Sequence, residues 1–112
     1  TNETTGILNK ELFNKMPQGG YIINVARGQH LVDEDLIDAI DSGKLSGAAL
    51  DVFHKEPLPT NHPFWQHSKI TITPHVASFT KPEAVIPKLV DNFNRMRNCD
   101  PLVNVVDLQK GY

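Results

Sequence analysis

Three features are scarce or missing in this sequence of 112 residues, and each absence argues against a class of protein. Cys99 is the only cysteine, so there is no disulfide framework, and we expect a reducing, cytoplasmic compartment. No apolar run approaches the roughly 20 residues needed to span a bilayer, so no membrane is expected as a partner. The formal net charge is only -2, which gives no electrostatic reason to expect binding to nucleic acid.

The chain also lacks an initial methionine and a signal peptide. It opens at Thr1, which suggests a piece of a longer protein. A length of 112 residues, of which 39% are hydrophobic and 21% are charged, fits one soluble globular domain.

Apolar runs of extended and helical periodicity alternate along the chain. Residues 21–26, 47–53 and 69–73 are short apolar runs flanked by turn residues, as is typical of parallel strands buried on both faces. Asn9 and Asp33 are expected to cap two helices, whereas the prolines between Pro57 and Pro63 make regular structure there unexpected. The pattern predicts an α/β domain whose small parallel sheet is incomplete by itself.

A long helix is predicted near the end of the chain. Residues 80–83 read as a capping box that begins with Thr80 and ends with Glu83. An apolar stripe follows at helical spacing, formed by Val85, Ile86, Leu89, Val90, Phe93 and Met96. Pro87 predicts a bend, and residues 98–112 are expected to be a tail on a neighbouring surface.

Polar side chains stand where each expected strand ends. Arg27 follows the first strand, Asp51 and Glu56 follow the second, and His75 follows the third. Ligands of open α/β sheets bind beyond the carboxyl ends of the strands, so we expect these side chains to converge on one rim. Each also has a plainer interpretation as a solvated charge or a structural residue, although burying Asp51 unpaired would cost several kcal/mol. Residue types alone leave the function open.

Three longer motifs carry a family resemblance. MPQGGYIINVARG at residues 16–28, GAALDVFHKEPL at 47–58 and TPHVA at 73–77 resemble, in order and spacing, the late motifs of D-isomer-specific 2-hydroxyacid dehydrogenases. Glu56 argues against the formate dehydrogenase branch, which has Gln there. Within the family, HPFWQH at residues 62–67 and the ending Lys110-Gly111-Tyr112 are most similar to bacterial glyoxylate/hydroxypyruvate reductases of type A.

The resemblance implies the C-terminal half of a Rossmann-like doubly wound parallel sheet. Residues 1–80 would be the C-terminal part of an NAD(P)-binding domain, and residues 81–112 a helix and tail that lead to a substrate domain. No G-x-G-x-x-G is present, and in the family this loop binds the cofactor pyrophosphate. We therefore expect the chain alone to bind cofactor weakly and to be inactive, and the intact enzyme to be a homodimer.

The resemblance also implies a role for each residue of the site. In the family reaction, hydride passes from NAD(P)H to C2 of a small 2-oxo acid, with NADPH favoured by resemblance only. His75 would donate the proton, Glu56 would orient its imidazole and favour the imidazolium form, and Arg27 would bind the substrate carboxylate. The implied cofactor contacts are Thr4, Val25, Ala26, Arg27, Asp51, His75, Ala77 and Ser78.

Other interpretations stay open at this stage. The same fold could serve as a non-catalytic module for protein association, as in the related C-terminal-binding corepressors. The sequence also leaves open NAD against NADP, and a D-lactate-type substrate against glyoxylate or hydroxypyruvate. The remaining histidines lack metal-ligand spacing, so no metal is expected. Trp65 is interpreted as a packing residue and Cys99 as inert.

Overall fold

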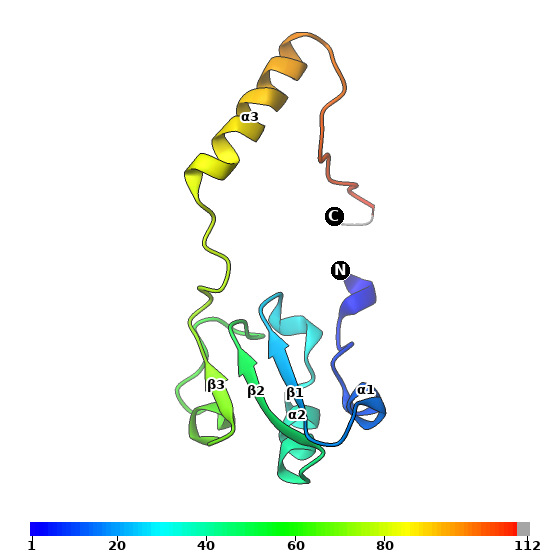
Figure 1. The fold of residues 1–112 in the computed structure, drawn as a ribbon, viewed down its shortest axis with the longest axis vertical. Coiled ribbons are helices and arrows are strands. Elements are labelled where there is room, and N and C mark those ends of the chain that lie inside the picture. The colour runs from blue at the N-terminus through cyan, green and yellow to red at the C-terminus, as the bar shows by residue number, and fades with distance from the viewer. Residues whose placement is uncertain (110–112) are drawn as a thin grey trace. The chain divides into compact units, whose positions relative to one another are not determined.

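The computed structural model describes residues 1–109, so the ending Lys110-Gly111-Tyr112 lies outside the described residues. Along the chain, the 3-10 helices (η), α-helices and strands are η1 (Asn2–Thr4), α1 (Lys10–Lys15), β1 (Gly20–Asn24), η2 (Gly28–His30), α2 (Asp33–Asp41), β2 (Leu45–Leu50), η3 (Pro63–Gln66), β3 (Ile70–Ile72) and α3 (Pro82–Arg97) (Figure 1). Residues 2–78 form one compact unit, which we call the body. The part from Phe79 onward, with Thr1, forms a second unit.

The body is built on a parallel sheet with the strand order β1-β2-β3. Tyr21 pairs with Gly47 and Asn24 with Leu50 across β1 and β2, and Leu50 pairs in turn with Ile72 of β3. All three strands run in the same direction, so their carboxyl ends meet at one rim (Figure 1). This arrangement confirms the predicted α/β fold with a parallel sheet.

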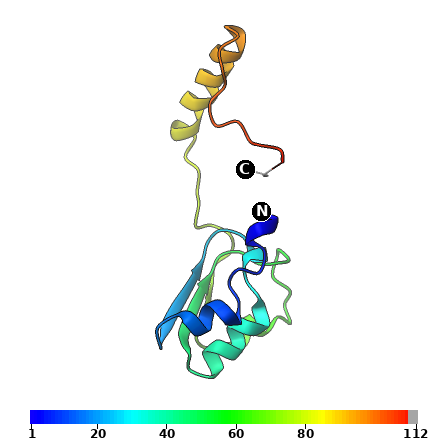
Figure 2. The same ribbon diagram turned by 90° about the vertical axis from the view of Figure 1, so that its right-hand side faces the viewer.

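One face of the sheet is covered by helix α2, which packs on β2 and against α1 (Figure 2). The core between them contains fully buried side chains such as Phe13, Leu36, Ile40 and Leu50. On β1, Ile22 and Asn24 are buried, whereas Tyr21 and Ile23 on the opposite face are 47% and 67% exposed. The expectation that this strand is buried on both faces is therefore wrong within residues 1–109.

The strands are shorter than the sequence predicted, and Arg27, Asp51 and His75 each lie beyond the end of one strand. Val25 and Ala26 lie beyond β1, Asp51 lies beyond β2, and Thr73 lies beyond β3. The chain turns directly after β1 because the side-chain oxygen of Asn24 accepts a hydrogen bond from Ala26 N. The Pro-rich connection also contains the 3-10 helix η3, which was not expected and begins at Pro63.

Two of the three expected helix caps are wrong. Asn9 caps α1 as predicted, since its side chain accepts a hydrogen bond from Leu12 N. Asp33 is instead the first residue of α2, and its carboxylate faces His54 and His62. Burial raises the pKa of Asp33, and the nearby charges of His54 and His62 only partly oppose this increase.

The second unit is organised around α3. The helix begins at Pro82, and Lys81 rather than Thr80 is its N-cap residue, without a side-chain hydrogen bond. The capping box is absent because a residue before proline is disfavoured in helical conformation, so Lys81 cannot be the first helical residue. None of the helix residues is buried, and no helix among residues 1–109 has the length and apolar character to cross a membrane.

Candidate active site

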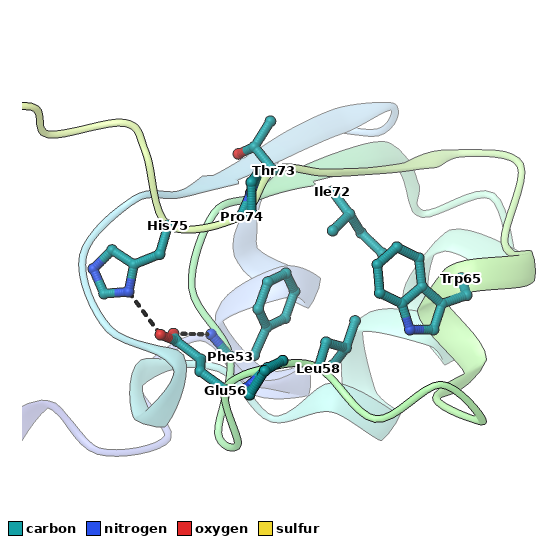
Figure 3. Close-up of a pocket in the computed structure, with 9 residues that line it drawn as sticks. Phe53, Glu56, Leu58, Trp65, Ile72, Thr73, Pro74 and His75 are labelled. Atoms are coloured by element: carbon teal, nitrogen blue, oxygen red, sulfur yellow. Dashed lines mark hydrogen bonds and ion pairs between the residues drawn. The ribbon is translucent and has the colours of Figure 1, made fainter.

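The clearest contact at the carboxyl rim joins His75 to Glu56. The imidazole Nδ1 lies 2.7 Å from Glu56 Oε2, and both side chains remain partly exposed (Figure 3). The other carboxylate oxygen of Glu56 accepts a hydrogen bond from Phe53 N at 2.9 Å. The carboxylate is therefore fixed by the backbone on one side and faces the imidazole on the other.

The electrostatics of Glu56 favour its charged form. The hydrogen bond with His75, followed by the one from Phe53 N, lowers the pKa of Glu56 below its ordinary value, against the effect of partial burial. The positive charges of His75 and Arg27 act in the same direction. Arg27 is thus close enough to influence Glu56 electrostatically, although the two side chains form no ion pair in the described part of the chain.

Arg27 lies in the turn after β1, where its side chain is exposed. Its Nη1 donates to its neighbour's carbonyl, Ala26 O, at 2.7 Å. The guanidinium is an exposed planar cation near the rim, and such a group can bind an anion through charge-assisted hydrogen bonds.

Asp51 fixes the loop that carries His75. Its Oδ1 accepts hydrogen bonds from the Thr73 hydroxyl at 2.5 Å and from Val76 N at 2.9 Å, and its Oδ2 accepts one from Ala77 N at 2.9 Å. His75 between these donors has a φ of 55°, a conformation that non-glycine residues adopt at a cost. The buried carboxylate therefore holds this loop in an unusual shape.

Two opposing effects set the pKa of Asp51. Burial raises it, but the hydrogen bonds from Thr73, Ala77 N and Val76 N outweigh burial, and the charge of His75 adds to them. The result is a pKa below the ordinary value, so the buried group is a carboxylate at neutral pH. The cost that the sequence implied for burying Asp51 is offset by these three donors.

The remaining predicted site residues differ in their placement. Val25 and Ala26 are exposed beside Arg27, and Ala77 reaches the site through its backbone N–H on Asp51. Ser78 is exposed at the end of the body. Thr4 lies in η1, where its hydroxyl is 3.2 Å from His30 Nε2.

A cavity of about 610 Å³ lies beside the Glu56–His75 pair. Phe53 and Leu58 lie in its middle, with Glu56 and His75 at one end and Trp65 and Ile72 at the other (Figure 3). Trp65 is about half exposed, and its Nε1 donates to Pro59 O at 2.9 Å. Its interpretation as a packing residue stays a prediction.

The other histidines make separate contacts. His54 Nε2 lies 2.8 Å from Leu31 O, and His67 Nε2 lies 3.2 Å from Asp41 Oδ1. Within residues 1–109, no group of three or more His, Cys, Asp or Glu side chains is arranged to hold a metal ion.

Comparison with known proteins decides the family. The family model for the NAD-binding domain of D-isomer-specific 2-hydroxyacid dehydrogenases matches residues 1–77. The chain belongs to this family. The sheet described above is accordingly part of a Rossmann-like NAD-binding domain, as the motifs predicted.

Solved structures of other dehydrogenases of the family are similar over the chain. A protein from Xanthobacter autotrophicus Py2, in complex with NADPH and MES, is 41% identical, with a TM-score of 0.93 over 100% of this chain and 46% of that chain. A family protein from Klebsiella pneumoniae 342 is 46% identical, with a TM-score of 0.85 over 96% of this chain and 34% of that one.

An NADPH-dependent glyoxylate/hydroxypyruvate reductase from Sinorhizobium meliloti, in complex with NADP and sulfate, is 38% identical, with a TM-score of 0.90 over 100% of this chain and 37% of that one. The chain thus spans less than half the length of these dehydrogenases.

Two residues at the rim were missed by sequence reasoning. Asn24 is buried at the end of β1, and its amide donates to Arg27 O at 3.0 Å. Gly28 is buried where the turn after β1 meets the backbone of Phe53 and His54. The sequence did contain a signal for Asn24, because a polar side chain at the end of an apolar strand poses the same question of burial as Asp51.

Proposed function

We propose that this chain supplies the reaction centre of a longer NAD(P)H-dependent reductase of small 2-oxo acids, of the glyoxylate/hydroxypyruvate type. The observation that carries the proposal is the 2.7 Å contact between His75 Nδ1 and Glu56 Oε2. With Nδ1 engaged by the carboxylate, Nε2 is the nitrogen left to transfer a proton. Membership of the dehydrogenase family and the intact Arg27 at the same rim support this function.

In the proposed reaction, His75 gives the proton from Nε2 to the carbonyl oxygen of the substrate. The carbonyl carbon receives a hydride at the same time, so a 2-oxo acid becomes a 2-hydroxy acid. Glu56 orients the imidazole through Nδ1 and stabilises its positive charge before the transfer. Arg27 binds the substrate carboxylate, for which a planar guanidinium is well suited because it can form two parallel hydrogen bonds.

The proposed nicotinamide site lies beside these groups. A nicotinamide cofactor, when bound, would supply the hydride. The residues here fit the nicotinamide end of the cofactor, since Val25 and Ala26 are exposed beside Arg27. Asp51 Oδ2 accepts a hydrogen bond from Ala77 N, and a carboxylate oxygen can accept a second one, here from the carboxamide N–H. Thr4, Ala77 and Ser78 are proposed as further contacts. NADPH is favoured because the similar Xanthobacter and Sinorhizobium proteins were solved with NADPH or NADP.

A hybrid enzyme tests the function. Residues 1–112 would replace the matching part of the Xanthobacter protein, and kcat/KM would be measured with glyoxylate, hydroxypyruvate and pyruvate, using NADPH and NADH. Arg27→Ala and His75→Ala should each lower kcat/KM by at least about a hundredfold, the scale of a lost charge clamp or acid catalyst. His67→Ala, a histidine paired with Asp41, is the matched control and should leave kcat/KM near the unsubstituted value.

Two results of this experiment would refute the proposal. One is near-normal kcat/KM in either the Arg27 or the His75 variant. The other is a folded hybrid that reduces none of the 2-oxo acids while the parent Xanthobacter protein does so, which would favour a non-catalytic module for protein association.

The pH profile tests the role of Glu56. Glu56→Gln keeps the shape of the side chain but removes the charge that stabilises imidazolium, so the alkaline limb of kcat/KM for reduction should move to lower pH. An unchanged profile in the hybrid would argue against the Glu56–His75 pair as the proton-donating unit.

The isolated chain is proposed to be inactive and to bind NADPH weakly. It lacks a glycine-rich loop for the pyrophosphate, which is a large part of the dinucleotide site in this fold. Calorimetric titration should show no micromolar binding of NADPH, and such binding would contradict this proposal. A homodimer and a cytoplasmic location are proposed for the whole enzyme from the family resemblance.

A further inference from the structure

The turn that carries Arg27, residues 25–28, is shaped from inside the protein by Asn24. The side chain of Asn24 is only 3% exposed, and both ends of its amide are used within this turn. Its Nδ2 donates to Arg27 O at 3.0 Å, and its Oδ1 accepts from Ala26 N at 3.2 Å. The amide therefore closes the turn and determines where the Arg27 side chain leaves the backbone.

The position of the same turn is set by Gly28. A Cβ on Gly28 would overlap the carbonyl group of Phe53 and the backbone N of His54. These are backbone atoms, so the contact could be relieved only if one of the two turns moved. Gly28 does not have a positive φ, so its small size is the reason for glycine at this position.

The backbone that Gly28 touches belongs to the turn that carries Glu56, residues 53–56. Phe53 N donates to Glu56 Oε1, and Glu56 Oε2 holds His75 Nδ1. A continuous series of short contacts therefore leads from the Arg27 turn, through Gly28 and Phe53, to Glu56 and His75.

We propose that Asn24 and Gly28 are positioning residues that hold the Arg27 turn at a fixed distance from the Glu56–His75 pair. Asn24 determines the shape of the turn, and Gly28 determines how closely it approaches the turn that carries Glu56. This inference rests on the proposed function in one respect: the guanidinium and the imidazole must act on the same substrate, and displacing either by about 1 Å can cost about a hundredfold in rate.

The matched variants are Gly28→Ala, Asn24→Ser and Gly47→Ala. Asn24→Ser shortens the side chain so that it no longer reaches both Ala26 N and Arg27 O. Gly47→Ala is the control, because a Cβ there would lie 2.5 Å from Lys69 O, between β2 and β3 and in the first half of β2. It creates a similar backbone conflict at a distance from the rim, so its Tm measures the purely structural cost.

The first measurement is the protonation of His75 in the 112-residue chain itself. Imidazole ¹⁵N chemical shifts report which ring nitrogen carries the proton, and the contact with Glu56 favours Nδ1. Gly28→Ala should reduce the Nδ1–H fraction because it displaces Phe53 and with it Glu56. Gly47→Ala should leave this fraction unchanged even where its Tm falls as far.

The second measurement uses the hybrid enzyme. Gly28→Ala and Asn24→Ser should raise KM for the 2-oxo acid by about tenfold or more, since a displaced Arg27 binds its carboxylate less well. For the control Gly47→Ala, KM for the 2-oxo acid and KM for NADPH should both stay within about twofold of the unsubstituted values.

Each outcome decides the proposal. It is overturned if Gly28→Ala and Asn24→Ser keep the normal KM and the normal His75 proton distribution, or if all three variants change in proportion to their loss of Tm. If Gly28→Ala does not fold, the proposal is decided by comparing KM for the 2-oxo acid in Asn24→Ser with that in Gly47→Ala. If the unsubstituted hybrid has no activity, the proposed function fails, while the ¹⁵N comparison still supports or rejects the positioning of the Glu56–His75 pair by Gly28.

Discussion

Helices α2 and α3 show the same apolar periodicity but have different environments. In α2, Leu36 and Ile40 are completely buried in the core of the body. In α3, Leu89, Phe93 and Met96 are between 54% and 63% exposed, and the helix has no buried residue. An apolar stripe therefore indicates that a helix needs a partner, and it does not indicate whether the same chain provides one.

The two units consequently depend on different interactions for their stability. The body has a buried core that extends from Phe13 to Phe64 in sequence. The second unit has local contacts, among them the Asp91–Arg95 ion pair and the hydrogen bonds between Asn92 and Val103. Because most helix stability in proteins comes from packing an apolar face, and α3 has no buried residue, α3 should be much less stable than the body.

The largest expected difference comes from truncating one leucine in each helix. Leu36→Ala removes a fully buried side chain and should destabilise the chain by about 2–5 kcal/mol, whereas Leu89→Ala on the exposed stripe should stay within about 0.5 kcal/mol. Urea unfolding followed by circular dichroism measures both. A comparable loss in the two variants would show that the stripe of α3 is buried in solution.

Hydrogen exchange should give a smaller but still clear contrast. Backbone amides of β2 are in the middle of the sheet and should exchange at least about a hundredfold more slowly than amides of α3, relative to their intrinsic rates. Equal protection in the two elements would contradict the distinction between the units.

A third comparison replaces one carboxylate in each unit. Asp51→Asn removes the charge that accepts three hydrogen bonds and should lower Tm by roughly 5–10 °C, whereas Asp91→Asn breaks only an exposed ion pair and should change Tm little. Thermal melts at neutral pH measure both variants.

The lowered pKa of Asp51 also predicts how Tm depends on pH. The pKa of Asp51 is lowered in the folded chain, so its carboxylate stabilises the fold above its ordinary pKa of about 4, and this contribution is lost as the pH falls through the folded value. Tm should therefore fall more steeply below about pH 4 in the unsubstituted chain than in Asp51→Asn. Parallel curves would reject the role assigned to the Asp51 carboxylate.

The smallest effect is expected for Asn92→Ala. This substitution removes both hydrogen bonds between Asn92 and Val103, and should speed exchange of the Val103 amide while leaving the Tm of the body unchanged. A fall in that Tm would mean that the two units unfold together.

Much of the fold could be predicted because its signals are local. The apolar runs gave the three strands, and the cap at Asn9 gave the start of α1. The cap at Thr80 was wrong because a competing local preference, that of Pro82 for the first helical position, determined where the helix begins. Asp33 was misassigned because its partners, His54 and His62, are distant in sequence.

The candidate site, too, has features that the sequence could predict and features that it could not. The order and type of Arg27, Glu56 and His75 were predicted from motifs, and the structure shows Glu56 in contact with His75. The closeness of Gly28 to the Phe53 carbonyl could not be predicted, because it depends on how two turns approach each other in space. Nor does a sequence show that His75 would have a positive φ.

The hydrogen bond between Asp51 and Thr73 has a consequence for how this family can vary. The two residues lie 22 positions apart, and their side chains are hydrogen-bonded to each other next to the loop that carries His75. Thr73 itself is exposed, so the dependence runs one way: a mutation at Thr73 removes one of the three donors to the buried Asp51 carboxylate. Among distant homologues, we therefore expect a hydroxyl-bearing residue at position 73 wherever position 51 is Asp, and a freer choice at position 73 where the carboxylate has been lost.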